Sequence, residues 1–290
     1  MRLAFLGTPD AAVPSLEALV HAGHDVALVI TRPDRRRGRG SQLMASPVKS
    51  AALELGLSVA HSLSSLDDSG VERGIVVAYG VIIPSVLLER TPMLNVHFSL
   101  LPRWRGAAPV QRAILAGDDE TGVSIITLEP TLDTGPVHLE RRVLVGEKTT
   151  RELTAELAAL GAAALIDVLG SRALLEHPRP QVGEITYAEK ITKEMLRLST
   201  SMTSEQMLRT IRLGGAYVVI SGKRLVVVSA HPSRHDVAAG TLELVDGEVV
   251  MGTKGGALTL YDVRLEGATT MRAVSWWAGH RGASAGLTWL

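Results

Sequence analysis

The sequence predicts two domains: a Rossmann-like α/β domain with a mostly parallel sheet, then a small C-terminal β-barrel of the oligonucleotide-binding (OB) type. Three observations lead to this prediction. Apolar runs of strand length alternate with helical patterns through residues 1–169. Two prolines and scattered charges then interrupt the pattern over residues 177–193, and short strands joined by glycine turns fill residues 217–263. These strands would also suit another small β-domain.

The N-terminal domain begins with an apolar strand at residues 3–6, which a turn at 7–10 closes before apolar residues recur at helical spacing. Further strands are predicted at 26–30, 74–78, 93–98, 121–128 and 137–145, and helices at 47–55, 107–115 and 149–169. In such a sheet ligands bind beyond the carboxyl ends of the strands. We expect every motif described below to follow such an end.

We place the N-terminal domain at residues 1–188, a linker at 189–202 and the C-terminal domain at 203–290. The C-terminal domain opens with a helix at 204–213, which Gly214 and Gly215 end. Its predicted strands are 217–220, 225–229, 241–245, 249–252 and 258–263.

The composition excludes several classes of protein. A 290-residue chain with 46% hydrophobic residues can bury a large core, and its net charge of zero argues against a uniformly basic nucleic-acid binder. The chain has no cysteine, which excludes disulfides and thiolate zinc sites. The apolar stretch 74–88 is broken by Pro84, and the first seven residues are too short for a signal peptide. We expect a cytoplasmic protein that does not enter a membrane.

Asn95 and His97 are the first candidate catalytic residues. Alternate residues of a strand face the same way, so the two side chains project together from a predicted strand. Such a pair can also be purely structural. Its surroundings favour catalysis, because a Leu-Leu-Pro turn, a Trp between two Arg, and a Gly-Ala-Ala helix start follow at once.

Asp133 lies in a predicted turn between two strands, Leu132-Asp-Thr-Gly-Pro136. An Asp there often forms only a local Asx-turn. A carboxylate that reaches an imidazole can instead orient it for acid–base chemistry. Sequence alone leaves both interpretations open.

The loop at residues 32–49 carries six basic residues and one acidic residue on a glycine-rich backbone. Its net charge is +5, residues 203–290 carry +2, and the remainder carries −7. A solvated surface loop is the ordinary interpretation of such a run. The alternative is an acidic body with a basic arm that binds RNA.

Nucleotide-binding motifs are missing from the sequence. Neither Gly-x-Gly-x-x-Gly after the first strand nor a Walker A lysine motif occurs, so dinucleotide and ATP binding lose their main support.

Residues 99–109, Ser-Leu-Leu-Pro-Arg-Trp-Arg-Gly-Ala-Ala-Pro, resemble the signature of the methionyl-tRNA formyltransferase family. The segments 7–9, 77–80, 132–135 and 187–190 stand in the family's order, and the resemblance covers nearly the whole chain. It implies transfer of a formyl group from 10-formyltetrahydrofolate to the α-amino group of methionine on initiator tRNA. The product, N-formylmethionyl-tRNA, serves translation initiation.

The resemblance also implies roles for individual residues. Asn95, His97 and Asp133 would be the catalytic set, with His97 either a base or a cationic oxyanion stabiliser. The residues that it assigns to the folate cosubstrate are Ala78, Tyr79, Gly80, Ser99, Leu100, Leu101 and Pro102. The residues that it assigns to tRNA are Arg35, Arg36, Arg37, Arg39 and Lys49. We expect no metal, and a monomer.

Two rival functions remain at this point. A formyltransferase acting on an amino sugar-nucleotide would share the catalytic set, and a non-catalytic RNA-binding module would bind no folate. Phe98 departs from the family pattern, in which Gly is common. It either narrows the folate turn or packs beneath it.

Overall fold

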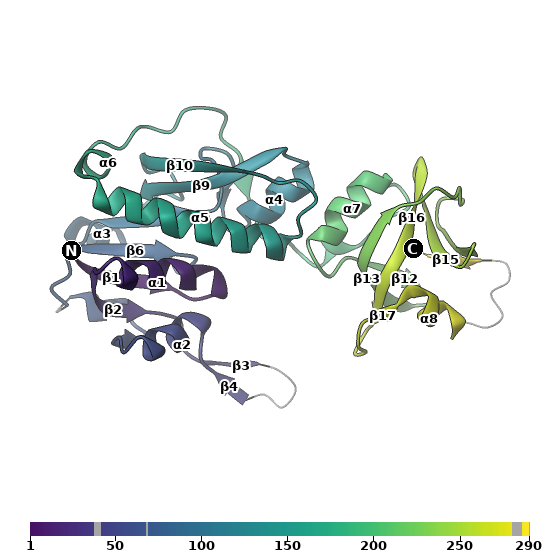
Figure 1. The fold of residues 1–290 in the computed structure, drawn as a ribbon, viewed down its shortest axis with the longest axis horizontal. Coiled ribbons are helices and arrows are strands. Elements are labelled where there is room, and N and C mark those ends of the chain that lie inside the picture. The colour runs from purple at the N-terminus through teal and green to yellow at the C-terminus, as the bar shows by residue number, and fades with distance from the viewer. Residues whose placement is uncertain (38–41, 68, 280–285, 290) are drawn as a thin grey trace. The chain divides into compact units, whose positions relative to one another are not determined.

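In the computed structural model, the chain forms two compact units (Figure 1). The residues described are 1–37, 42–67, 69–279 and 286–289. The N-terminal unit comprises Met1–Val110, Asp119–Val145 and Glu152–Glu189. The C-terminal unit comprises Gln111–Asp118, Gly146–Arg151 and Lys190–Leu290.

The N-terminal unit is built on one sheet with the strand order β10-β9-β7-β6-β1-β2-β5. Its strands are β1 (Arg2–Gly7), β2 (Asp25–Ile30), β5 (Val59–Ala60), β6 (Arg73–Val77), β7 (Met93–His97), β9 (Glu120–Thr127) and β10 (Val137–Leu144). Strands β7, β6, β1, β2 and β5 pair in parallel, and β9 and β10 pair antiparallel at one edge. These pairings confirm the predicted mostly parallel sheet. It was predictable because its central strands are buried on both faces and are therefore rich in branched apolar residues.

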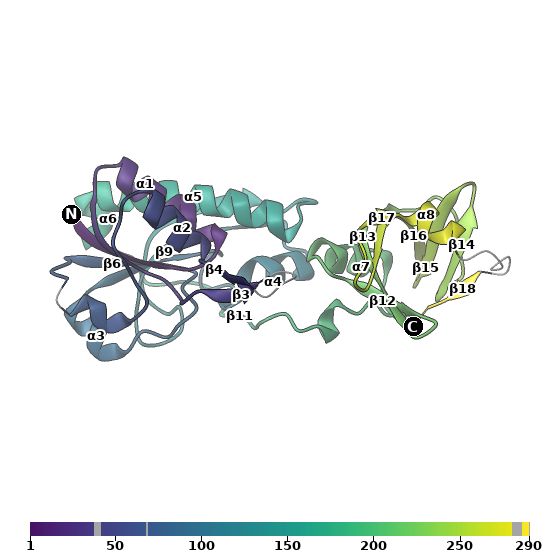
Figure 2. The same ribbon diagram turned by 90° about the horizontal axis from the view of Figure 1, so that it is seen from below.

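Helices cover both faces of this sheet. Figure 2 shows α1 (Val13–His21), α2 (Pro47–Glu54) and α5 (Thr150–Gly170) on one side and α3 (Ser85–Arg90) on the other. This unit also contains α6 (Arg172–Glu176) and the 3₁₀ turns Asp10–Ala12 and Leu63–Leu66, whereas most of α4 (Pro109–Ala116) belongs to the C-terminal unit. Ala4, Leu6 and Met93 belong to the apolar cluster against which α3 packs its leucines.

Helix α5 is, among the described residues, the one helix long and apolar enough to cross a membrane. Core helices of folded proteins share this composition, and half of the apolar stretch is buried. A Cβ on Gly161 would come within 2.7 Å of Val96 Cγ1, so this helix lies very close to β7.

Several short elements were not predicted. The basic loop contains a hairpin of β3 (Arg35–Arg37) and β4 (Gln42–Met44), which extends away from the sheet (Figures 1 and 2). The prediction of a loop over residues 32–49 is therefore wrong for the residues of these two strands. Strand β11 (Tyr187–Ala188) pairs in parallel with β8 (Arg105–Gly106), so the polar stretch 177–189 belongs to the fold of the N-terminal unit.

The C-terminal unit is a nearly closed antiparallel barrel, and the predicted barrel is thereby confirmed. Its strands are β12 (Tyr217–Ile220), β13 (Lys223–Pro232), β14 (Thr241–Val245), β15 (Glu248–Thr253), β16 (Gly256–Leu265), β17 (Met271–Arg272) and β18 (Leu287–Thr288). The 3₁₀ turn Glu194–Leu196 precedes α7 (Ser204–Arg212), which a capping box at Thr203 and Gln206 begins, and α8 (Ala273–Ala278) follows β17. Trp276 and Trp289 are buried in its core, where they stabilise the fold.

Candidate active site

Strand β7 presents alternate side chains to opposite faces of the sheet. Val96 and Phe98 lie on the α5 side, where Phe98 Cε1 would be 3.6 Å from a Cβ on Gly161. Phe98 is therefore packed beneath the strand. Asn95 and His97 share the other face with Met93, and both side chains are buried. The predicted common direction of Asn95 and His97 follows from this alternation.

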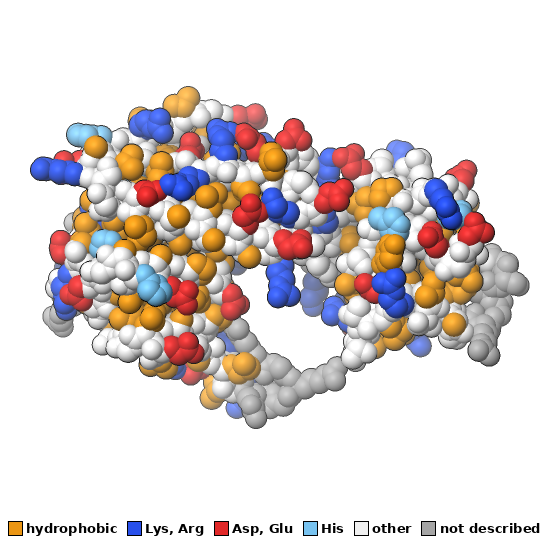
Figure 3. Space-filling model, in the orientation of Figure 1, with side chains coloured by type: hydrophobic (Ala, Val, Ile, Leu, Met, Phe, Trp, Pro, Cys, Tyr) orange, Lys and Arg blue, Asp and Glu red, His pale blue; other side chains and the backbone are white. Residues whose placement is uncertain are grey.

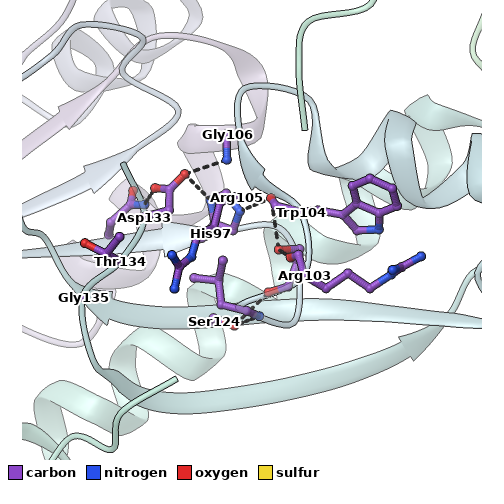
Figure 4. A network of polar contacts seen from close by, with 12 residues as sticks. His97, Arg103, Trp104, Arg105, Gly106, Ser124, Asp133, Thr134 and Gly135 are labelled. Atoms are coloured by element: carbon purple, nitrogen blue, oxygen red, sulfur yellow. Dashed lines mark hydrogen bonds and ion pairs between the residues drawn. The ribbon is translucent and has the colours of Figure 1, made fainter. Parts of the chain in front are cut away.

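His97 is held through both ring nitrogens (Figure 4). Its Nε2 lies 2.9 Å from the backbone oxygen of Trp104, and its Nδ1 lies 3.6 Å from Oδ2 of Asp133. A carbonyl oxygen can only accept a hydrogen bond, so Nε2 must carry a proton. Proton exchange at this ring is left to Nδ1, which faces a carboxylate.

Asp133 closes the cluster. Its Oδ2 accepts a 2.8 Å hydrogen bond from the backbone N–H of Gly106, and Asn95 Nδ2 approaches Oδ1 to 3.4 Å. The residue has φ +51°, a conformation that costs energy for any residue but glycine. The structure thus brings together all three predicted catalytic residues, and Asp133 is more than an Asx-turn.

The route by which Asp133 reaches His97 differs from the expectation. Strand β9 runs antiparallel to β7, with Thr127 opposite Leu94, so its carboxyl end lies at the opposite edge of the sheet. The loop after β9 returns over the sheet face to bring Asp133 to His97. We predicted that every motif follows the carboxyl ends of the parallel strands. This prediction is wrong for the loop that contains Asp133.

Hydrogen bonds from two serine hydroxyl groups stabilise the turn after β7. Ser99 Oγ donates to the backbone oxygen of Arg103 at 2.6 Å, and Ser124 Oγ donates to that of Ser99 at 2.8 Å. The peptide bond between Leu101 and Pro102 is cis. The side chains of Ser99, Leu101 and Pro102 are buried, and that of Leu100 is half-buried.

The backbone of the next part of the turn is held by the segment around β11, a contact that the sequence did not predict. The N–H of Trp104 donates to Thr186 Oγ1 and that of Arg105 to the Thr186 carbonyl, both at 2.9 Å. The Ala188 carbonyl accepts from two further N–H groups of the turn, at 2.8 and 3.0 Å. The motif at residues 187–190 was the sequence signal for this segment.

Gln181 is a second residue that sequence reasoning missed. Its amide nitrogen lies 2.8 Å from the backbone oxygen of Asp133 and 2.9 Å from that of Gly135. Its amide oxygen accepts from Nε and Nη2 of Arg105, at 3.0 and 2.5 Å. An isolated glutamine in a proline-rich stretch carries no signal that would have singled it out.

Ala78, Tyr79 and Gly80 follow the carboxyl end of β6. Ala78 and Gly80 are exposed and have positive φ, and the Tyr79 carbonyl accepts from Thr8 Oγ1 at 3.2 Å. The Tyr79 side chain is buried, which raises the pKa of its hydroxyl, although the charge of Arg32 opposes this shift. Beyond them Ile82 is 88% exposed, an apolar side chain in open solvent beside polar backbone.

The five predicted tRNA-binding residues lie in different surroundings. Arg35 and Arg36 are exposed on β3 and stand opposite Met44 and Leu43, which are exposed as well. Arg37 continues the strand. Arg39 lies outside the described residues.

Lys49 forms an ion pair with Asp34 at 2.8 Å, so a phosphate would have to compete with a carboxylate for it. On the face of the N-terminal unit that Figure 3 shows, acidic and basic side chains are interspersed. Among the described residues, no group of three or more His, Cys, Asp or Glu side chains is placed to hold a metal ion.

Chemically, the cluster combines an amide donor, a buried carboxylate, and an imidazole whose Nδ1 faces that carboxylate. Such a set can orient a carbonyl group, stabilise the oxyanion formed when a nucleophile adds to it, and move one proton. Acyl transfer to a neutral nucleophile is the reaction class that it supports best.

Comparisons with known proteins point to the same chemistry. Residues 1–169 match the family described as formyl transferase, and residues 190–281 match the formyl transferase C-terminal domain. A methionyl-tRNA formyltransferase from Roseobacter denitrificans is 41% identical, over 96% of this chain and 96% of its own.

Solved structures share the fold. The methionyl-tRNA formyltransferase from Clostridium thermocellum matches with a TM-score of 0.58 at 15% identity, over 91% of this chain and 98% of its own. HypX from Aquifex aeolicus, in complex with tetrahydrofolic acid, matches with a TM-score of 0.68 at 19% identity. That match covers 98% of this chain and 48% of HypX, so this chain spans about half the length of HypX.

Proposed function

The chain belongs to the formyl transferase family, and from this premise we propose that it formylates the α-amino group of methionyl initiator tRNA with 10-formyltetrahydrofolate as donor. The product is N-formylmethionyl-tRNA, which serves translation initiation. The observation that carries the proposal is the convergence of Asn95, His97 and Asp133 on one face of β7, in a chain that aligns over 96% of its length with the Roseobacter denitrificans relative.

In the proposed reaction the amine nitrogen forms a bond to the formyl carbon, and the bond from that carbon to N10 of the folate breaks. The side-chain amide of Asn95 donates to the oxyanion that forms on the formyl oxygen. His97 accepts the proton of the amine at Nδ1 and returns it to the departing N10. The Asp133 carboxylate, 3.6 Å away, stabilises the imidazolium between these two transfers.

The ends of β6 and β7 fit the folate cosubstrate. A pterin ring is flat and carries amide-like groups, and the exposed backbone of Ala78 and Gly80 offers donors and acceptors beside the apolar Ile82. Because the side chains of Ser99 and Leu101 are buried, those two residues would act by shaping the turn.

The hairpin β3–β4 is the proposed contact with the acceptor stem of tRNA. Arg35 and Arg36 supply charge for phosphates, and each has an exposed apolar residue directly opposite. Phosphate contacts give affinity, and the apolar side chains add a surface for bases. The resemblance also assigns Arg39, which lies outside the described residues, to tRNA.

The test is a formylation assay with purified protein, charged initiator methionyl-tRNA and 10-formyltetrahydrofolate. A competing amino sugar-nucleotide should remain unmodified, and formylation of the sugar in preference to tRNA would overturn the proposed substrate. Calorimetry with a folate analogue should show binding; its absence would favour an RNA-binding module without catalysis.

We further propose that the enzyme acts as a monomer in the cytoplasm and needs no metal. Each group that the reaction requires comes from one chain. Light scattering should therefore report one chain per particle, and EDTA should leave the rate unchanged.

A further inference from the structure

We propose that Gln181 is a positioning residue for the formyl transfer, acting by holding Asp133 against His97. This inference rests on the proposed function. It assigns a role in the reaction to a residue between the two matched family segments, which end at 169 and begin at 190.

The orientation of the Gln181 amide follows from its partners. Arg105 has only donors, and its Nε and Nη2 both point at one end of the amide, so that end must be the oxygen. The backbone oxygens of Asp133 and Gly135 only accept, so the nitrogen must face them. The amide thus makes four hydrogen bonds, which is its full capacity.

These four hydrogen bonds join two segments that build the site. One is the turn that contains Asp133 and Gly135, and the other is β8, which contains Arg105 and Gly106. Between the same two segments runs the hydrogen bond from the Gly106 N–H to the Asp133 carboxylate, at 2.8 Å. Gln181 therefore holds the backbone of Asp133, while the Gly106 N–H holds its carboxylate.

Asp133 needs such support. Its φ of +51° is disfavoured for a residue with a side chain, and such a conformation persists only where surrounding contacts impose it. Asp133 faces His97 at 3.6 Å, a distance that small rotations of the turn would lengthen. Arg105 is only 8% exposed, so its guanidinium is a fixed anchor for the amide.

Two substitutions separate positioning from simple packing. Gln181→Ala removes all four hydrogen bonds. Gln181→Glu keeps the size and shape and gains a charge pair with Arg105, but sets a carboxylate oxygen against two carbonyl oxygens. We expect kcat to fall about tenfold to a hundredfold in both variants, as for a misplacement of the order of 1 Å, with the KM values for tRNA and folate little changed. The Glu variant should keep the thermal stability of the wild type.

Val182→Ala is the matched control. Val182 is the next residue and is 87% exposed, so its truncation perturbs the same segment without touching the turn. Its kcat should equal that of the wild type.

A double-mutant cycle tests whether Gln181 acts through Asp133. In an Asp133→Asn background, measured in single turnovers with excess enzyme, Gln181→Ala should cause little further loss. Equal losses in both backgrounds, or a Glu variant as active as the wild type, would overturn the inference. If the wild-type protein itself formylates no tRNA, it is the proposed function that fails.

Discussion

His97 and Asp133, 36 positions apart in the sequence, face each other across 3.6 Å, while the far nitrogen of the imidazole donates to the Trp104 carbonyl. The hydrogen bond of Nε2 fixes the orientation of the ring, and Nδ1 is the nitrogen that can exchange a proton. His97→Asn should therefore lower kcat by about 10²–10⁴-fold, the range expected when a positioned acid–base group is lost. Single-turnover formylation would measure it, and activity near that of the wild type would contradict the mechanism.

The pH dependence separates the two roles open to His97. As a base it must be neutral, so kcat/KM should fall on acidification, and His97→Asn should weaken this dependence. A cationic oxyanion stabiliser would give the opposite slope, with the rate falling as the pH rises. Profiles of both proteins with saturating folate would decide between them.

Asp133→Asn tests the carboxylate with almost no change in shape. The variant can still accept the hydrogen bond from Gly106 but no longer stabilises a positive charge on His97. We expect a loss of about 10²-fold or more in kcat, with the KM for folate unchanged. A loss confined to KM would assign Asp133 to binding instead.

The proposed contact of the basic hairpin with tRNA can be tested by measuring how binding depends on salt concentration. Arg36→Ala should raise the KM for tRNA and reduce the slope of log affinity against log salt by about 0.7–0.9 for each phosphate that the variant no longer neutralises. Arg39→Ala should act in the same way. Arg172→Ala is a suitable control, because that side chain is 85% exposed but pairs locally with Glu176. The folate KM should stay constant in all three.

We predict that a side chain at position 135 cannot be accommodated without displacing the turn. A Cβ at this position would lie 1.8 Å from the Thr127 carbonyl oxygen, so Gly135→Ala must displace the turn that carries Asp133. We expect a loss of about 1–3 kcal/mol in the free energy of unfolding, together with lower kcat. Gly170→Ala, where nothing lies within 4 Å of the new atom, should change neither. Urea unfolding and formylation assays on the pair would show this.

Much of the N-terminal sheet could be predicted because its strands are buried on both faces and so read as continuous apolar runs. The β3–β4 hairpin could not, because arginines occupy β3 and the described side chains of Arg35, Arg36, Leu43 and Met44 are all exposed, so they show no alternation. The shared face of Asn95 and His97 could be predicted from a strand period of two. The meeting of His97 with Asp133 could not, because it depends on a loop that crosses the sheet face.

Gln181 and Thr186 escaped prediction for a different reason. They act on the backbone of other segments from an extended stretch, and such interactions leave no periodicity in the sequence.

Strand β11 sets a limit on how the chain can be divided. The first family match ends at residue 169, yet Gln181, Thr186 and Ala188 all lie beyond it and bind the turns around His97 and Asp133. A recombinant fragment cut at residue 169 would leave at least six backbone N–H and C=O groups without their partners. The shortest fragment worth expressing therefore ends at Glu189, because a fragment trimmed to the family boundary would lose the residues that hold the turns around His97 and Asp133.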